Sequence, residues 1–224
     1  MEKVVLITGA GGGLGKELAK LYQEKGYSLV LTDKKQEGFE DLKVENIEVV
    51  IGDLTKEETI QELATLIREK YKRIDILINN AGITFIQPFE ENTTEQLDKI
   101  LEIDLKAPMK LTKELYPLMV EQESGHIINI NSSAGKEGKA NHTMYSAAKF
   151  GLAGFTQALR AEAKGQNIRV TSFHPGGINT PFYEHLGGKV DASVYMDPKK
   201  VAEIIVFLSE TEGMSPDEIV LNRM

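Results

Sequence analysis

Residues 4–15 of the chain read Val4-Val5-Leu6-Ile7-Thr8-Gly9-Ala10-Gly11-Gly12-Gly13-Leu14-Gly15. The apolar run has no polar alternation, which predicts a strand that is buried on both faces, as in a parallel sheet. Five of the seven residues from Gly9 to Gly15 are glycines, and apolar residues then recur at helical spacing. The unit is therefore expected to be strand, tight turn and helix.

A glycine turn before a helix is typical of a phosphate site. The helix start offers unpaired backbone N–H groups and a positive dipole end, and glycines let an anion approach closely. The spacing fits neither Gly-x-x-x-x-Gly-Lys-[Ser/Thr] nor Gly-x-Gly-x-x-Gly, and leaves the pattern Thr8-Gly9-x-x-x-Gly13-x-Gly15. A turn that binds nothing is the alternative, but the buried strand and amphipathic helix around it favour phosphate.

The composition limits the classes of protein to consider. A chain of 224 residues can bury one substantial core, so we expect a single domain over residues 1–224. The absence of cysteine excludes disulfides, and the four histidines show no metal-ligand spacing. A net charge of -8 argues against nucleic-acid binding. Without a signal segment or an apolar run near ~20 residues, we expect a soluble cytoplasmic protein with no membrane partner.

Apolar strands alternate with helical patterns along the chain. Strands are expected over residues 28–32, 47–51, 74–78, 125–131, 168–173 and 218–221. This alternation predicts an α/β fold with a doubly wound parallel sheet, Rossmann-like and three-layered. Ligands of such sheets sit beyond the carboxyl ends of the strands, which is where the polar motifs of this chain lie.

Acidic residues end the second and third expected strands. Asp33 lies roughly 20 residues beyond the glycine turn, where a carboxylate can accept hydrogen bonds from the ribose of an adenosine. A 2'-phosphate would meet its negative charge, so Asp33 favours NAD over NADP, although Lys34 and Lys35 can offset the repulsion. As alternatives, Asp33 is a turn or cap residue, and Asp53 either contacts the adenine or begins the next turn.

Asp104 falls on the apolar stripe of the helix that begins near Thr93 or Thr94. A carboxylate on a buried face is expensive unless it has a partner, so Asp104 is a site candidate. Pro108 has no N–H to donate to the Asp104 carbonyl, which leaves that carbonyl available to hold water. The alternative is a helix kink with the carboxylate turned to solvent.

Tyr145 and Lys149 are four residues apart in an expected helix and share one of its faces. Alone they would be an ordinary surface pair. Together with Thr8-Gly9-x-x-x-Gly13-x-Gly15, Asn79-Asn80-Ala81-Gly82 and Ser132, in this order, they make the chain resemble the short-chain dehydrogenase/reductase family. Pro175-Gly176-Gly177-Ile178-Asn179-Thr180 is similar to that family's loop over the nicotinamide. The resemblance runs from residue 8 to residue 180.

The resemblance implies hydride transfer between a nicotinamide cofactor and a carbonyl or secondary alcohol. Tyr145 would be the general acid/base, Ser132 would donate a hydrogen bond to the substrate oxygen, and Lys149 would hold ribose hydroxyls. An ammonium about 4 Å from a phenolate stabilises it by up to ~4 kcal/mol at an effective dielectric constant of 20, or roughly three pKa units. Lys149 is therefore expected to lower the pKa of Tyr145.

The resemblance also implies the cofactor contacts. Gly9, Gly13 and Gly15 would shape the phosphate turn, and Asp33 and Asp53 would address ribose and adenine. Asn80 would line the adenosine path, and Ile178 and Thr180 would hold the carboxamide. The remaining expected cofactor-binding residues are Thr8, Leu14, Leu54, Ala81, Gly82, Tyr145, Lys149, Pro175 and Gly176.

Asp104 departs from the family, which usually carries asparagine there and uses its main-chain carbonyl to bind a water leading to the lysine. We expect the carbonyl function to survive, with Asp104 as part of the catalytic set, while its charge near Lys149 shifts the pH dependence. The alternative function is a catalytically weak dinucleotide-sensing protein of the same fold, which only Asp104 supports.

Residues 181–197 show no helical or strand regularity and predict a mobile lid over the substrate. Its residues Phe182, Tyr183, His185, Tyr195 and Met196 either line the pocket or pack the loop down. No clustered arginines indicate an acidic substrate, so a neutral or modest-sized carbonyl compound is expected. The resemblance implies a homodimer or homotetramer through helices with small residues; tight packing on the chain's own sheet is the alternative.

Overall fold

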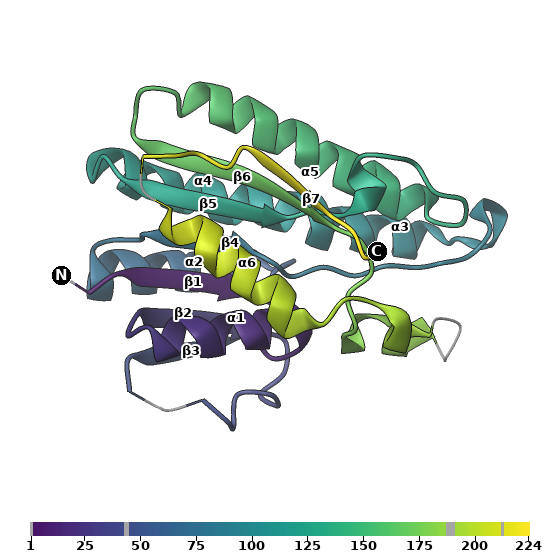
Figure 1. Ribbon diagram of the computed structural model, residues 1–224, viewed down its shortest axis with the longest axis horizontal. Coiled ribbons are helices and arrows are strands. Elements are labelled where there is room, and N and C mark those ends of the chain that lie inside the picture. Colours follow the sequence, from purple (N-terminus) through teal and green to yellow (C-terminus); the bar gives the residue numbers. More distant parts are fainter. Residues whose placement is uncertain (1, 43–44, 187–190, 212) are drawn as a thin grey trace.

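Parallel strands form the centre of the molecule in the computed structural model, which describes residues 2–42, 45–186, 191–211 and 213–224 (Figure 1). Within these residues the sheet has the order β3-β2-β1-β4-β5-β6-β7, and all neighbours are parallel. The strands are β1 (Val4–Thr8), β2 (Ser28–Asp33), β3 (Ile47–Ile51), β4 (Ile76–Asn79), β5 (Gly125–Ile130), β6 (Ile168–Pro175) and β7 (Glu218–Leu221). Ligands of such sheets bind where the strand order reverses, here between β1 and β4.

Helices connect the strands. The α-helices are α1 (Gly13–Glu24), α2 (Glu57–Leu66), α3 (Thr94–Leu101), α4 (Ala107–Glu121), α5 (Thr143–Glu162) and α6 (Pro198–Glu210). Two π-helical segments are η1 (Ile67–Tyr71) and η3 (Glu102–Lys106). The 3-10 helices are η2 (Phe89–Glu91), η4 (Ser133–Gly135), η5 (Pro181–Leu186) and η6 (Ala192–Val194).

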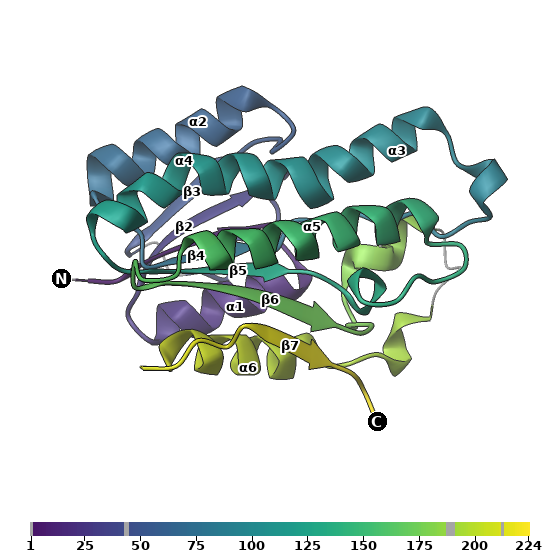
Figure 2. The ribbon, with the colours of Figure 1, turned by 90° about the horizontal axis from the view of Figure 1, so that it is seen from above.

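The helices cover both faces of the sheet. Successive side chains of a strand point to opposite faces, so Val5 and Ile7 pack toward α1 and α6. Val4 and Leu6 pack toward α2, α4 and α5. Figure 2 shows these two helix layers with the sheet between them. The doubly wound, three-layer α/β fold that the sequence predicts is confirmed.

Four predicted strands differ at an end, and those expected over 28–32 and 125–131 differ by one residue only. The strand expected over 74–78 begins at Ile76, where pairing with β1 and β5 starts. The strand expected over 168–173 continues through His174 and Pro175, because these residues pair with Val220 and Leu221 of β7. The carboxyl end of β6 is thus held by its pairing with β7. The local sequence does not reveal which residues of the two strands pair.

The helix that carries Asp104 contains a π-helical segment and no break. Residues 94–121 are helical throughout, with η3 directly before Pro108 at the start of α4. A π-helical turn is one way for a helix to accommodate a proline, which has no N–H to donate to the carbonyl four residues earlier. Asp104 lies within η3, is 0% exposed and pairs with Lys149, so the expected buried carboxylate with a partner is confirmed and the alternative of a carboxylate turned to solvent is wrong.

The glycine turn depends on its missing side chains. Gly9 and Gly13 have φ of 64° and 51°, a region that favours glycine. Gly15, inside α1, lies so close to the glycine turn that an added Cβ would overlap the Gly9 carbonyl oxygen. Glycine at this position therefore allows α1 to pack against the turn that precedes it.

Gly15→Ala is expected to lower the free energy of unfolding by about 1–3 kcal/mol, because the methyl group would force α1 and the glycine turn apart. Gly138→Ala is a matched control, since a Cβ there meets nothing within 4 Å. Its effect is expected to stay within ~0.5 kcal/mol. Urea unfolding of both variants measures the difference, and equal stability of the two would contradict the close packing.

Candidate active site

A cavity of about 590 Å³ opens at the carboxyl ends of β1, β2, β4, β5 and β6. Most of the residues expected from the sequence line it. These are Gly9, Gly13, Leu14, Asp33, Leu54, Asn80, Ala81, Gly82, Ser132, Tyr145, Lys149, Pro175, Gly176, Ile178 and Thr180. The fold thus brings motifs from residue 9 to residue 180 around one volume.

Four expected residues, Thr8, Gly15, Asp53 and Asp104, are not among those that line the cavity. Thr8 accepts hydrogen bonds at its Oγ1 from the backbone N–H groups of Asn80 and Ala81, both at 3.0 Å. Gly15 contacts the Gly9 carbonyl from within α1. Asp53 accepts at Oδ1 from the backbone N–H and hydroxyl of Thr55. Thr8, Gly15 and Asp53 therefore shape the turns, and the fourth, Asp104, acts from behind Lys149.

The glycine turn is braced from two neighbouring strands. The Asn80 amide donates to the carbonyl oxygens of Thr8 and Gly9, at 2.9 and 3.0 Å. The Asp33 carboxylate accepts from the backbone N–H of Gly11 at 3.0 Å and of Lys34 at 2.7 Å. The turn is thus preorganised at the N-terminus of α1, which is a favourable place for a phosphate. An added Cβ on Gly12 would meet nothing within 4 Å, so this cradle has room for a ligand.

The adenosine end of the cavity carries both signs of charge. Asp33, Lys34 and Lys35 all line it. The Lys34 ammonium pairs with the Asp53 carboxylate at 3.0 Å, and this contact helps to hold the pKa of Asp53 low. Lys34 is therefore already engaged by a carboxylate on the neighbouring loop.

Tyr145 lies in the first turn of α5 and reaches the cavity beside Ser132. Burial raises the pKa of the Tyr145 phenol, the Asp104 carboxylate raises it further, and a hydrogen bond with Ser132 opposes this. The Ser132 Oγ accepts from the backbone N–H of Ala134 at 3.1 Å. Ser133, in contrast, binds the Lys139 ammonium at 2.7 Å. Of the two serines, Ser132 is the one beside Tyr145.

Lys149 and Asp104 form a buried ion pair behind Tyr145. Lys149 Nζ is 3.0 Å from Asp104 Oδ1, and it donates to the Ile130 carbonyl oxygen at 3.1 Å. The other carboxylate oxygen, Oδ2, accepts from the backbone N–H of Ile83 at 3.1 Å. Burial raises the pKa of Asp104, while Lys149 and the Ile83 N–H oppose that shift. An added Cβ on Gly82 would be 2.7 Å from Oδ1, so glycine gives the carboxylate its space.

This pairing changes the electrostatic expectation for the tyrosine. The sequence predicts that Lys149 lowers the pKa of Tyr145, whereas in the structure burial and Asp104 hold that pKa above its ordinary value. The Lys149 ammonium lies 5.5 Å from the centre of the Tyr145 ring and has a carboxylate next to it. The opposing charge of Asp104 offsets the lysine's effect on the phenol. The resting site therefore holds a phenol.

Aromatic side chains surround the end of the cavity next to Tyr145. Phe85, Phe182 and Tyr183 line it, together with Ile83 and Ile103. The centroids of the Tyr145 and Phe182 rings are 6.3 Å apart, and those of Phe182 and Tyr183 are 5.1 Å apart. An apolar or aromatic group would bury its surface well here.

The segment 181–197 is more regular than expected, since η5 and η6 lie within it. Met196 is joined to the preceding loop by backbone hydrogen bonds with Gly177 and Asn179. Tyr195 packs on Gly177 and on Tyr183. The side chain of His185 and residues 187–190 lie outside the described part, so the mobile lid stays a prediction.

Among the residues that sequence reasoning missed are two polar ones at the carboxyl ends of β5 and β6. Asn131 follows β5, lines the cavity and accepts the Ser132 N–H at 2.9 Å. His174, at 0% exposure in β6, contacts the Ser132 carbonyl oxygen at 3.0 Å. Both are polar residues at the carboxyl ends of apolar strands, which is a signal that the sequence carried for each of them.

Two other kinds of site are absent from the part of the chain that the structure describes. No group of three His, Asp or Glu side chains there could hold a metal ion. None of the helices in that part is long and apolar enough to cross a membrane.

Comparisons with known proteins agree with this geometry. The family described as short chain dehydrogenase matches residues 3–190. The 3-oxoacyl-(acyl-carrier-protein) reductase FabG of Thermotoga maritima is 33% identical over 225 residues, covering 94% of this chain and 92% of that protein.

Solved structures are similar over nearly the whole chain. A 4-hydroxyisoleucine dehydrogenase complexed with NADH superposes with a TM-score of 0.88 at 27% identity, covering 99% of this chain and 97% of that one. A metagenomic short-chain oxidoreductase in complex with NADP has a TM-score of 0.85 at 27% identity, with coverages of 99% and 97%. The chain therefore belongs to the short-chain dehydrogenase/reductase family of nicotinamide-dependent oxidoreductases.

Proposed function

We propose that Tyr145 transfers a proton to or from the substrate oxygen in a reaction between a carbonyl compound and the corresponding secondary alcohol. The observation that carries this proposal is the shared cavity. It joins the glycine turn after β1 to Ser132, Tyr145 and Lys149, so that a dinucleotide held at one end would reach the proton donor at the other. A nicotinamide cofactor, when bound, supplies or accepts the hydride.

The phenol of Tyr145 is the proton donor for carbonyl reduction. Its raised pKa keeps the proton on the oxygen near neutral pH, which suits an acid better than a base. Ser132 Oγ accepts the Ala134 N–H, and its hydrogen bond with Tyr145 places the hydroxyl beside the phenol, from where it would donate to the substrate oxygen. Lys149, held by Asp104 and the Ile130 carbonyl, would meet the ribose hydroxyls.

NAD is the favoured cofactor. Asp33 lines the adenosine end, and its carboxylate keeps lone pairs for ribose hydroxyls after accepting two backbone N–H groups. A 2'-phosphate would lie against this charge. The pairing of Lys34 with Asp53 supports the same preference, while Lys35 leaves binding of NADP possible.

The substrate is an apolar or aromatic carbonyl compound of modest size. Phe85, Phe182 and Tyr183 support this, and the described lining contains no arginine that would indicate an acidic substrate. The carbonyl oxygen would meet Ser132 and Tyr145, with the apolar part against the aromatic side chains.

We also propose a homodimer or homotetramer in the cytoplasm. Large apolar side chains on two helices support assembly through these faces. Phe150 on α5 is 47% exposed and Phe207 on α6 is 68% exposed, so each helix presents an apolar ring that a second chain would cover. The absence of cysteine suits a reducing compartment.

Tyr145→Phe is expected to lower turnover at least ~100-fold, because the ring keeps its packing but has no proton to transfer. Binding of NADH, followed by fluorescence titration, is expected to change by no more than ~3-fold, since the loss concerns one hydrogen bond at most. A panel of ketones and secondary alcohols supplies the activity readout. A wild-type chain that binds NADH and turns over no member of the panel would indicate a dinucleotide-sensing protein, and wild-type turnover by the variant would refute the role of Tyr145.

Wild-type protein is expected to bind NADH more tightly than NADPH. Asp33→Asn should cut the ratio of the two affinities by about tenfold, equivalent to ~1.4 kcal/mol, because it removes the charge opposing a 2'-phosphate. Asp41→Asn, which removes an exposed carboxylate paired with Lys16, is the control and should leave the ratio unchanged. Tighter NADPH binding by the wild-type chain would overturn the preference.

Asp104→Asn is expected to move the pH profile of alcohol oxidation to lower pH. The oxidation direction needs Tyr145 without its proton, so the rate rises as pH passes the tyrosine pKa. Asp104 raises that pKa, and the uncharged amide would no longer do so. Asp98→Asn, an exposed change on the adjoining helix α3, is the control. An unshifted profile for Asp104→Asn would show that the carboxylate charge does not act on Tyr145.

A further inference from the structure

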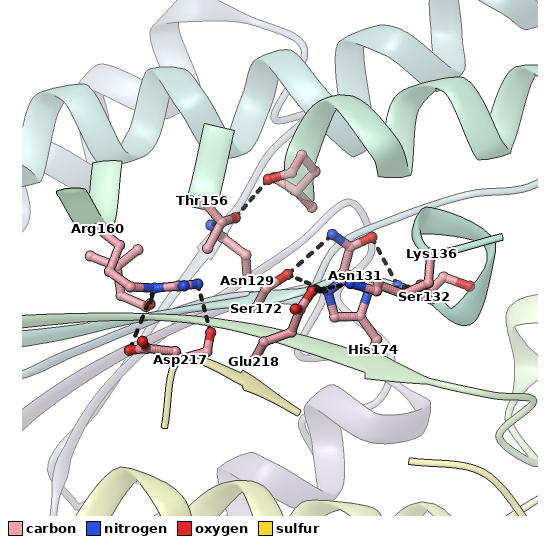
Figure 3. A network of polar contacts seen from close by, with 12 residues as sticks. Asn129, Asn131, Ser132, Lys136, Thr156, Arg160, Ser172, His174, Asp217 and Glu218 are labelled. Atoms are coloured by element: carbon pink, nitrogen blue, oxygen red, sulfur yellow. Dashed lines mark hydrogen bonds and ion pairs between the residues drawn. The ribbon is translucent and has the colours of Figure 1, made fainter. Parts of the chain in front are cut away.

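The backbone of Ser132 is held by a side chain at each of its polar groups (Figure 3). Its N–H donates to Asn131 Oδ1 at 2.9 Å. Its carbonyl oxygen is 3.0 Å from His174 Nδ1. A carbonyl oxygen only accepts, so Nδ1 must carry a hydrogen and donate it. His174 is 0% exposed, and this contact gives its ring a defined tautomer.

The second nitrogen of His174 has two oxygen neighbours. Nε2 is 2.8 Å from Ser172 Oγ and 3.0 Å from Glu218 Oε1. Ser172 Oγ also accepts from the Asn131 amide at 3.3 Å. The contacts close a ring through Asn131, Ser132, His174 and Ser172, with Glu218 attached at the histidine.

Glu218 brings the edge strand β7 into this ring. It is the first residue of β7, and its carboxylate pairs with the Lys136 ammonium at 2.8 Å. Lys136 directly follows η4, the short helix that begins after Ser132. The edge strand is therefore linked to the Ser132 segment both directly, through Lys136, and through the imidazole of His174.

The charged groups around His174 act in opposite directions. Burial lowers the pKa of His174, and Lys136 lowers it further, while the Ser132 carbonyl and Glu218 raise it. In the neutral ring, the Ser172 hydroxyl donates to Nε2. In the protonated ring, Nε2–H donates to the Glu218 carboxylate. The Nδ1–H bond to Ser132 is the same in both states.

We propose that His174 is a positioning residue of the reaction, which holds the Ser132 backbone through Nδ1–H while Glu218 holds the opposite side of the imidazole. The proposal rests on the proposed role of Ser132. His174 also immediately precedes Pro175 and Gly176, which line the cavity. One imidazole thus connects the serine loop, the loop after β6 and the edge strand. Small displacements of a positioned group reduce rates strongly.

Two substitutions separate the two nitrogens of His174. In His174→Asn the amide NH₂ can take the place of Nδ1 and still donate to Ser132, whereas His174→Gln reaches only toward the Nε2 position. His174→Gln is expected to lower kcat by at least ~10-fold with the KM for cofactor unchanged. His174→Asn should stay within ~3-fold of wild type, since it keeps the donor. Equal losses in both variants would mean that His174 has only a packing role and would overturn the proposal.

The role of Glu218 is tested by NMR titration of the ¹⁵N-labelled histidine rings. Glu218→Gln should lower the pKa of His174, because it removes the carboxylate that favours the protonated ring. Asp217→Asn, the preceding residue, faces Arg160 at 3.6 Å and should leave that pKa unchanged. An equal response to the two substitutions would overturn the part assigned to Glu218.

The same spectra separate this inference from the proposed function. In wild-type protein at neutral pH, the proposal requires a hydrogen on Nδ1 of His174, and a ring with Nδ1 unprotonated would overturn it. This readout needs no substrate. If wild-type protein carries the Nδ1–H but turns over no substrate, the proposed reaction is refuted, and the positioning role of His174 falls with it. The hydrogen bond between His174 and Ser132 would still be established.

Discussion

The site depends on the ion pair between Lys149 and Asp104, in which the carboxylate is fully buried and the lysine is 3% exposed, at the cavity. Transferring two charges from water into the protein interior costs free energy. A buried ion pair is therefore stable only where its geometry is close and further hydrogen bonds satisfy both charged groups. Here the carboxylate also accepts the Ile83 N–H and the ammonium donates to the Ile130 carbonyl. These contacts join the loop after β4, the end of β5 and α5. They fix Lys149, and Tyr145 one helical turn earlier is fixed with it at the mouth of the cavity.

The pair also determines which form of Tyr145 rests in the site. A lysine with no counter-charge would favour the phenolate, whereas a lysine beside a carboxylate has little net effect. Burial then dominates, and the tyrosine keeps its proton. A phenol in this place suits the proposed transfer of a proton to a carbonyl oxygen. The ring of contacts at Ser132 supplies the second requirement, a hydroxyl held at a defined place beside that phenol.

Much of the fold was predictable because its determinants are local. The unbroken apolar run at Val4–Thr8, the glycine turn and the alternation of strands and helices indicate a doubly wound sheet, and its carboxyl edge gathers the motifs. The direction of the pKa shift of Tyr145 was not predictable, because it depends on how deeply Tyr145 and Asp104 are buried and on the distance between Asp104 and Lys149. His174 was missed for a similar reason. Its partners Ser132 and Glu218 are distant in sequence and meet only through the pairing of β5, β6 and β7.

We infer that Tyr145 rests as a phenol because burial and, after it, the Asp104 carboxylate raise its pKa. The direct measurement is a pH titration of the wild-type chain with ¹³C-labelled tyrosine rings, in which the Tyr145 signal is assigned by its loss from a Tyr145→Phe sample. Tyr145 is expected to stay protonated at pH values above ~10, the pKa of an unperturbed tyrosine. Ionisation of Tyr145 below that value in the cofactor-free protein would contradict this inference.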